Sequence, residues 1–112
     1  MAVDSVVLEQ LVPSAATESD VYTVPTGRRA SVRIYVATVT AAAIDVKIRK
    51  AGEASAAKQC LACSASVLLN SSNQYPEVGT ILLSAGDVVT VESDQADTAF
   101  TVNGYEDDIP TE

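Results

Sequence analysis

The sequence predicts an all-β fold: a single-domain antiparallel β-sandwich, or a related jelly-roll-like unit, of about seven to eight strands. Apolar and polar residues alternate at a period of two along much of the chain, and turn-forming residues separate these runs at short intervals. Alanine, valine, serine and threonine dominate the composition, with one Phe and no Trp. Small and β-branched side chains pack well on a pleated surface. With 112 residues the chain can build one modest core, so we expect one domain.

The N-terminal half contains four expected strands. The first lies near residues 5–12 and the second at residues 21–24. Pro25-Thr26-Gly27 supplies a turn, with proline early and glycine late, that leads into a long alternating strand at residues 28–38. The fourth strand, at residues 44–49, alternates in the same way. We expect the last two strands to place one face in the core and the other in solvent.

The C-terminal half contains further expected strands at residues 59–63, 80–83, 88–91 and 99–102. Ala85-Gly86-Asp87 supplies the turn between the second and third of these. Together with the N-terminal strands, they give the short strands and frequent turns that are typical of a sandwich.

Two segments have weaker patterns. Residues 51–66 are rich in alanine and are compatible with a short helix or with a loop of small residues between the sheets, although a glycine and several serines disfavour the helix. Residues 70–74 are polar and predict a mobile loop. We divide the chain into an N-terminal arm with the first strand (1–20), a β-sandwich domain (21–106) and an acidic C-terminal tail (107–112).

The charged residues follow the order negative, positive, negative, with a net charge of −8. Residues 1–27 carry four acids and no basic residue, residues 28–58 carry all seven basic residues and two acids, and residues 59–112 carry nine acids. Acidic and basic strands could pair within one sheet, or a basic face could meet an acidic face on another molecule; we favour pairing within the chain. An acidic chain with one short basic block is a poor nucleic-acid binder, so we expect no nucleic-acid partner.

We also expect no membrane segment and no export signal. The chain has no apolar run of about 18 residues, which a membrane-spanning helix needs. Its first residues carry acids where a signal peptide has a basic region. We therefore expect the chain to stay in the compartment where it is made.

The residues needed for common catalytic and metal sites are missing. The sequence has no His, which excludes serine triads and zinc sites built on imidazole within this chain. Cys60 and Cys63 form a lone C-x-x-C, and two residues three apart on a regular strand point to opposite faces, so we expect two small, buried, reduced thiols. Asp94, Asp97 and the acids at 106–108 could hold calcium, but they lack EF-hand spacing. We expect no enzyme activity, no metal, no cofactor and no small-molecule substrate.

Two groups of residues are candidates for a contact with partner molecules. The arginines of the long strand either protect its edge and keep it soluble, or form the basic half of a contact with acidic loops of a neighbour. The apolar N-terminal segment at residues 2–12 can add a strand to a neighbouring molecule. The candidate interface residues are Val3, Val6, Val7, Leu8, Leu11, Arg28, Arg29 and Arg33.

Three stretches, taken in order, carry a resemblance to a known class of proteins. Residues 21–30 read V-Y-T-V-P-T-G-R-R-A, residues 83–89 read L-S-A-G-D-V-V, and residues 100–106 read F-T-V-N-G-Y-E. The chain thereby resembles small β-sandwich virion proteins of tailed bacteriophages over residues 21–106. Residues 51–75 depart from this pattern in their alanine and serine content and their cysteine pair.

The resemblance implies a virion structural protein without catalytic activity, and it assigns no binding residues. One role that it implies is that of a capsid decoration (cement) protein, which binds the outer surface of the phage head and stabilises the shell by bridging capsid subunits. Its partners would then be the major capsid protein and other copies of itself, as a homotrimer. The other role is that of a tail, neck or fibre-associated component. In both roles the chain is made in the bacterial cytoplasm and ends in the virion. A carbohydrate- or metal-binding module is a different possibility, and the lack of Trp and His counts against it.

Overall fold

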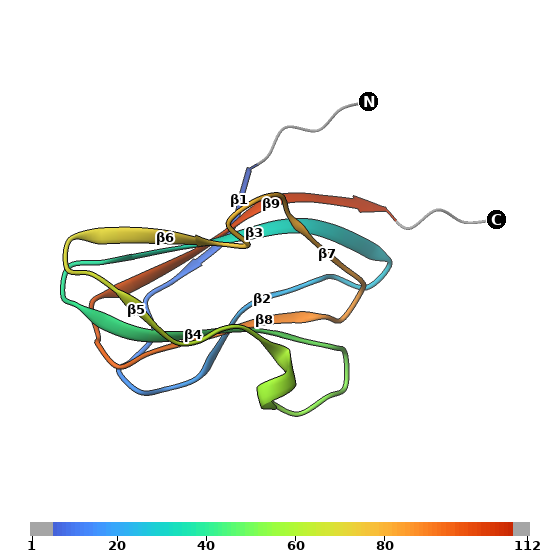
Figure 1. The fold of residues 1–112 in the computed structure, drawn as a ribbon. Coiled ribbons are helices and arrows are strands. Elements are labelled where there is room, and N and C mark those ends of the chain that lie inside the picture. Colours follow the sequence, from blue (N-terminus) through green and yellow to red (C-terminus); the bar gives the residue numbers. More distant parts are fainter. Residues whose placement is uncertain (1–5, 109–112) are drawn as a thin grey trace.

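The computed structural model describes residues 6–108, which form two antiparallel sheets stacked as a sandwich (Figure 1). The predicted all-β sandwich is therefore confirmed, with nine strands in this part of the chain. The elements are β1 Val6–Leu11, β2 Ser19–Thr23, β3 Arg28–Thr38, β4 Ala42–Arg49, the 3₁₀ helix η1 Ala57–Gln59, β5 Cys60–Val67, β6 Ser71–Tyr75, β7 Ile81–Leu83, β8 Val88–Ser93 and β9 Thr98–Asp108.

Each layer in Figure 1 is one sheet. The upper sheet has the strand order β1-β9-β3-β6, with β7 also paired to β3 beyond the end of β6. The lower sheet has the order β2-β8-β4-β5. The two longest strands, β3 and β9, pair along their full lengths from Arg28↔Asp108 to Thr38↔Thr98 and form the centre of the upper sheet. The first and last strands of the described residues, β1 and β9, therefore lie side by side in the same sheet.

The core lies between the sheets and follows the alternation in the sequence. Val32, Ile34 and Val36 of β3 point inward and are fully buried, as are Ile44 and Val46 of β4 in the opposite sheet. Their neighbours in the sequence point outward, as a period of two requires. Burying one Val or Ile side chain stabilises a fold by about 1.5–3 kcal/mol, so these positions determine which face of each strand points inward.

The two predicted turns are confirmed, and they contact each other. In the first, the Arg28 amide donates to the Pro25 carbonyl at 3.2 Å, and Gly27 has a φ of +79°. The second turn lies at residues 84–87 between β7 and β8. Val24 joins the turns, because its amide donates to the Asp87 carbonyl at 3.0 Å and its carbonyl accepts from the amide of the second turn's glycine at 2.9 Å.

The prediction of a mobile loop at residues 70–74 is wrong. Ser71–Tyr75 form strand β6, which pairs in regular antiparallel register with β3 from Ile34↔Tyr75 to Thr38↔Ser71. β6 is an edge strand with exposed or half-buried side chains, so polar residues suit it and no apolar alternation marks it. The strand is held by backbone hydrogen bonds to β3 and not by burial of an apolar face.

The alanine-rich segment at residues 51–66 is neither a single helix nor a plain crossing loop. It contains a turn, the short helix η1 and then the eight-residue strand β5, which extends beyond the expected strand at residues 59–63. β5 follows β4 irregularly, with two register shifts along the pair. Those irregularities explain why a strict period of two is absent from its sequence.

The first two residues of the expected acidic tail are also part of the sandwich. Asp107 and Asp108 end β9, where they pair with Arg29 and Arg28 of β3. Opposite charges across the strands stabilise this pairing, which continues the sheet past residue 106. The rest of the tail lies outside the described residues.

Candidate functional site

The basic start of β3 lies against the acidic end of β9. Arg28 Nε is 3.1 Å from Glu106 Oε1, and Arg28 Nη1 is 2.7 Å from Asp108 Oδ1. Arg29 Nη2 is 3.3 Å from Asp107 Oδ2. The predicted pairing of charged strands within the chain is thus confirmed here. Partly exposed pairs of this kind contribute about 0.2–1 kcal/mol each, so they align the strands more than they stabilise the fold.

Tyr22 connects this charge cluster to the other sheet. Its ring is buried between the layers, and its hydroxyl donates to Glu106 Oε2. Burial, together with the hydrogen bond to the Glu106 carboxylate, raises the pKa of Tyr22 well above its ordinary value. The phenol is therefore held as a neutral donor, which is a structural role and not that of a proton-transfer group near neutral pH.

Arg33, the third arginine of β3, holds a loop. Its Nε and Nη2 both donate to the carbonyl oxygen of Gly79, at 2.8 Å and 2.6 Å. Gly79 lies between β6 and β7, so the guanidinium ties this connection to the outer face of β3. All three arginines predicted as interface residues therefore have partners within the chain.

A hollow of about 340 Å³ lies on the outer face of the upper sheet beside the charge cluster. Leu82 and Tyr105 flank Ser31 in register and leave a gap above this small residue, whose hydroxyl is 2.6 Å from that of Thr80. The Ser31 hydroxyl and the Arg29 and Asp107 side chains already have partners, so the hollow suits an apolar side chain better than a reacting substrate. Its lining residues are Arg29, Ala30, Ser31, Leu82, Leu83, Ser84, Tyr105 and Asp107.

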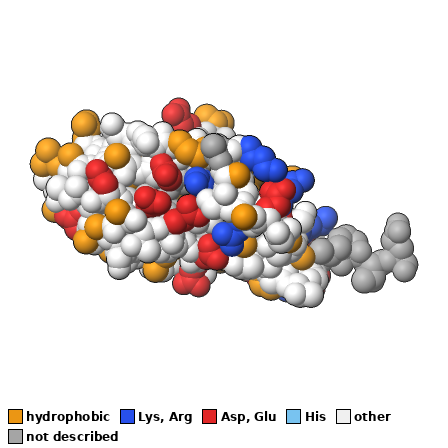
Figure 2. All heavy atoms as spheres, turned by 90° about the horizontal axis from the view of Figure 1, so that it is seen from below, with side chains coloured by type: hydrophobic (Ala, Val, Ile, Leu, Met, Phe, Trp, Pro, Cys, Tyr) orange, Lys and Arg blue, Asp and Glu red, His pale blue; other side chains and the backbone are white. Residues whose placement is uncertain are grey.

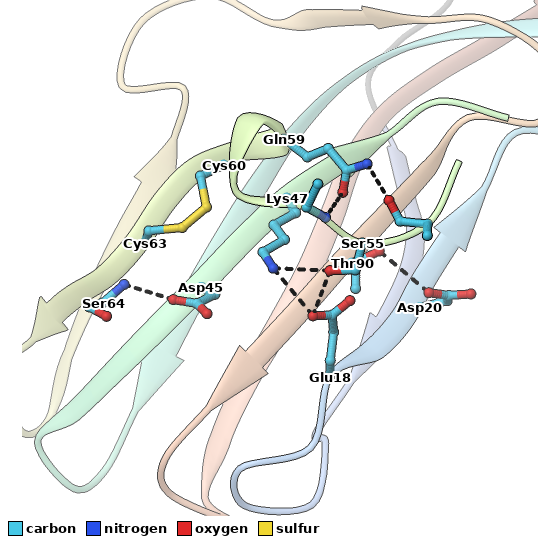
Figure 3. A network of polar contacts seen from close by, with 12 residues as sticks. Glu18, Asp20, Asp45, Lys47, Ser55, Gln59, Cys60, Cys63, Ser64 and Thr90 are labelled. Atoms are coloured by element: carbon cyan, nitrogen blue, oxygen red, sulfur yellow. Dashed lines mark hydrogen bonds and ion pairs between the residues drawn. A yellow bond between two sulfur atoms is a disulfide. The ribbon is translucent and has the colours of Figure 1, made fainter. Parts of the chain in front are cut away.

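A second polar network lies on the outer face of the lower sheet (Figure 3). Lys47 of β4 donates to Glu18 Oε2 at 3.4 Å and to the Ser55 hydroxyl at 3.0 Å, and that hydroxyl donates to Glu18 at 3.0 Å. Gln59 fixes the same connection, because its side chain donates to the Ala54 carbonyl at 2.8 Å. The network thus anchors the segment between β4 and β5, and its lysine is neutralised by a carboxylate.

Asp20 of β2 and the two aspartates of the turn between β8 and β9 also have structural partners. Arg49 Nη2 lies 3.1 Å from Asp20 Oδ2, which ties β4 to β2 across β8. Asp94 accepts the Ala43 amide at 2.9 Å, and Asp97 accepts the Thr40 hydroxyl at 2.6 Å. Asp97 thus holds the turn between β3 and β4, and Asp94 holds the start of β4.

The prediction of two buried, reduced thiols is wrong. Cys60 and Cys63 form a disulfide with their Cα atoms 5.8 Å apart, and Cys63 is exposed (Figure 3). The expected opposite orientation requires a regular strand, but β5 has a bulge between the two cysteines. Val46 pairs with Ala62 while Lys47 pairs with Cys60, so one extra residue lies between these positions. That residue brings both cysteines to the same side of β5.

The bulge is extended by a further irregularity just after the disulfide. Ser64 has a φ of +52°, and its amide donates to Asp45 Oδ1 of β4 at 2.7 Å (Figure 3). The Asp45 side chain thus takes the place of a backbone acceptor at a point where the ladder is interrupted. The disulfide and this hydrogen bond together fix the irregular course of β5.

The apolar candidates from the N-terminal segment have different environments. Leu8 and Leu11 are half-buried and pack against the core, so they hold β1 to the sandwich. Val6 and Val7 are more than half exposed and are accessible to a partner. Val3 lies outside the described residues.

An exposed apolar cluster that was not predicted from the sequence lies at the end of the sandwich that holds the turn between β5 and β6. Leu68 and Leu69, in the turn between β5 and β6, are 72% and 62% exposed. Val39 lies in the adjoining turn, which is joined to this one because the Asn70 amide donates to the Val39 carbonyl at 3.2 Å. The signal available in the sequence was the run Val67-Leu68-Leu69, three consecutive apolar residues that interrupt the alternation, so that not all of them can face the core.

The described part of the chain has neither a grouping of three or more potential metal ligands nor a helix long and apolar enough to cross a membrane. Within it, every buried side-chain nitrogen and oxygen has a hydrogen-bond partner. No protein-family model matches the chain, and searches of curated proteins and solved structures found no significant match.

Proposed function

We propose that this chain is a non-enzymatic structural protein of a tailed-phage particle. In this role it is a decoration protein that binds the outer surface of the head, contacts the major capsid protein and other copies of itself, and stabilises the shell by bridging capsid subunits. A tail, neck or fibre location in the same particle is the alternative.

The observation that carries the proposal is the fold. The motifs that resemble phage virion proteins run from the first strand of the lower sheet to β9, and these residues form a two-layer β-sandwich with a filled interior. Three groups of polar side chains have their partners within the chain: Arg28 with the end of β9, Lys47 with Glu18, and Arg33 with the Gly79 carbonyl. These contacts stabilise the sandwich and its loops. Exposed valines, leucines and a tyrosine remain at its margins, where contact with other subunits would remove them from water.

The disulfide gives further support. Structural disulfides are typical of proteins that function in oxidising surroundings, virion surfaces included, and are rare in proteins that remain in a reducing cytosol. A cystine on an outer edge strand suits a chain that is assembled into an extracellular particle.

The test is to purify mature particles of the phage that encodes the chain, count its copies by quantitative mass spectrometry and locate it by electron cryo-microscopy. A decoration protein covers repeated sites on the shell, so we expect copies on the order of hundreds. We also expect two-layer β density on the outside of the head. A few dozen copies on the tail would support the alternative location. Absence from purified particles would overturn the proposal.

The contribution of β1 to particle binding needs point substitutions, because deleting residues 1–12 would remove a strand that covers the core. Val6→Ser combined with Val7→Ser changes only exposed side chains and should weaken binding to particles. Val12→Ser is the matched control, since Val12 is as exposed as Val7 and lies just beyond the strand. Equal binding by the wild type, the double variant and Val12→Ser would exclude β1 as the docking strand. It would not contradict the proposed location in the particle.

A further inference from the structure

The longest uncharged stretch of the sequence forms one margin of the sandwich. Residues 59–76, between Lys58 and Glu77, contain no charged residue. They make up β5, β6 and the turn between them, and these strands are the edges of the lower and upper sheets on the same side (Figure 1). We call residues 59–76 the uncharged margin.

The edge of β6 lacks the features that normally prevent two sheets from joining. Within the described residues, β1 carries an exposed Glu9, β2 carries an exposed Asp20, and β7 has only three residues. β5 is interrupted by its bulges. β6 has five residues in regular register with β3, and its other edge pairs with no strand of the described chain. Charge, shortness and bulges are the common protections of an edge strand, and β6 has neither a charge nor a bulge.

Apolar side chains are exposed beside this open edge. Leu68 and Leu69 precede β6, and the hydrogen bond from Asn70 to Val39 adds a third exposed apolar residue to the cluster. Figure 2 shows apolar side chains at the left end of the molecule and the basic side chains in its middle and right part. The margin therefore offers backbone hydrogen bonds and apolar surface, but no charge for electrostatic recognition.

The charge distribution indicates which molecule can cover this margin. The arginines of β3 and the Lys47 and Arg49 side chains of β4 are used inside the chain, so the surface offers little positive charge to an acidic partner. Two copies of this acidic chain repel each other where their carboxylates approach. That repulsion is smallest where both copies present uncharged margins, which also match each other in chemistry.

We propose that the uncharged margin is the surface through which copies of this chain associate, with the open edge of β6 and the leucine pair of one copy meeting the same margin of another around a symmetry axis. This inference rests on the self-association included in the proposed function. It is independent of where in the particle the chain is located.

The experiment is sedimentation velocity of the purified full-length chain over a range of concentrations. The wild type should form a defined oligomer. Leu68→Ser with Leu69→Ser should weaken association by at least about 100-fold, since every copy loses both leucines and each leucine removed from water contributes about a factor of ten. Val12→Ser is the matched control: Val12 is 56% exposed just after β1, the opposite edge of the upper sheet, and its loss should leave association unchanged.

A second pair of variants tests the charge argument. Ser72→Glu places a carboxylate on β6 at an exposed position and should dissociate the oligomer. Thr26→Glu adds the same charge at an exposed turn outside the margin and should not. Circular dichroism of every variant should match the wild type, because each altered side chain is exposed.

A wild-type chain that remains monomeric at every concentration would overturn the inference, as would equal association by the wild type and the double leucine variant. If the monomeric chain nevertheless binds particles, the margin inference fails and the proposed function stands. If the chain associates through the margin but is absent from particles, the proposed function fails and the margin inference stands.

Discussion

Gly104 gives the sharpest test of how closely β3 and β9 pack. A Cβ atom added at this position would lie 1.9 Å from the carbonyl oxygen of Ser31 and 2.9 Å from the Cα atom of Val32. Real Cβ atoms essentially never approach another heavy atom to less than 3.0 Å. The obstacle is backbone of the central strand, which cannot rotate away as a flexible side chain can. Substitution of Gly104 by Ala must therefore separate the two longest strands of the upper sheet.

The magnitude follows from that separation. Bringing the new contact from 1.9 Å to 3.0 Å requires a shift of about 1.1 Å, which takes neighbouring ladder hydrogen bonds out of their range near 2.9 Å. We expect Gly104→Ala to lower the free energy of unfolding by at least about 3 kcal/mol, the upper part of the range for overpacking. For a domain of this length, that loss lowers the melting temperature by roughly 12 °C. Thermal and urea denaturation followed by circular dichroism measure both quantities.

Gly27→Ala is the control for the conformational part of the effect. Gly27 has a φ of +79° in a turn, and no heavy atom would lie within 4 Å of an added Cβ. Its substitution should cost about 1–2 kcal/mol, the strain of a left-handed residue. If Gly104→Ala destabilises the chain no more than Gly27→Ala does, the close packing of β3 on β9 is wrong.

Three further predictions concern a buried phenol, the disulfide and a loop anchor. Because the pKa of Tyr22 is raised in the folded state, the unfolded chain ionises first, so stability should hold below about pH 10 and fall above it. Tyr22→Phe should remove that fall in urea denaturation, and an unchanged fall would contradict the assignment. Reduction of Cys60–Cys63 should lower the free energy of unfolding by about 2 kcal/mol, because the bond closes a very short loop. Denaturation with and without dithiothreitol measures this, and identical midpoints would contradict it. Arg33→Ala should speed amide hydrogen exchange around Gly79 without changing it in the core strands, and unchanged exchange would show that the guanidinium does not hold this loop.

The parts of the fold that the sequence predicted depend on local rules. Val32, Ile34 and Val36 alternate because a half-buried strand has a period of two, and that period alone identifies the face that is buried. The turn at residues 25–28 follows from proline and glycine chemistry. The order of the three charge blocks predicted that acidic and basic strands pair within one sheet, because opposite charges stabilise neighbouring strands. The ion pairs between β3 and β9 confirm this prediction.

The parts that were missed depend on long-range pairing. β6 forms because its backbone pairs with β3, more than thirty residues earlier in the chain. Its exposed polar side chains show no alternation from which that pairing could be predicted. The Cys60–Cys63 bond depends on a bulge in β5, and a bulge is a property of two strands in register rather than of one sequence segment. The exposure of Leu68 and Leu69 depends in turn on where β5 ends and β6 begins.

The placement of charge connects these observations. A contact between oppositely charged surfaces requires charges that the molecule does not already use itself, but Arg28 and Arg29 are paired with the end of β9, and Lys47 and Arg49 with acids near β2. Breaking such pairs to bind another molecule would leave carboxylates without their partners, in a chain that is already strongly acidic. Contacts with further subunits are therefore more favourable where the chain has no charge to neutralise. That condition disfavours the arginines of β3 as a contact surface and favours the edge strands that carry no charge.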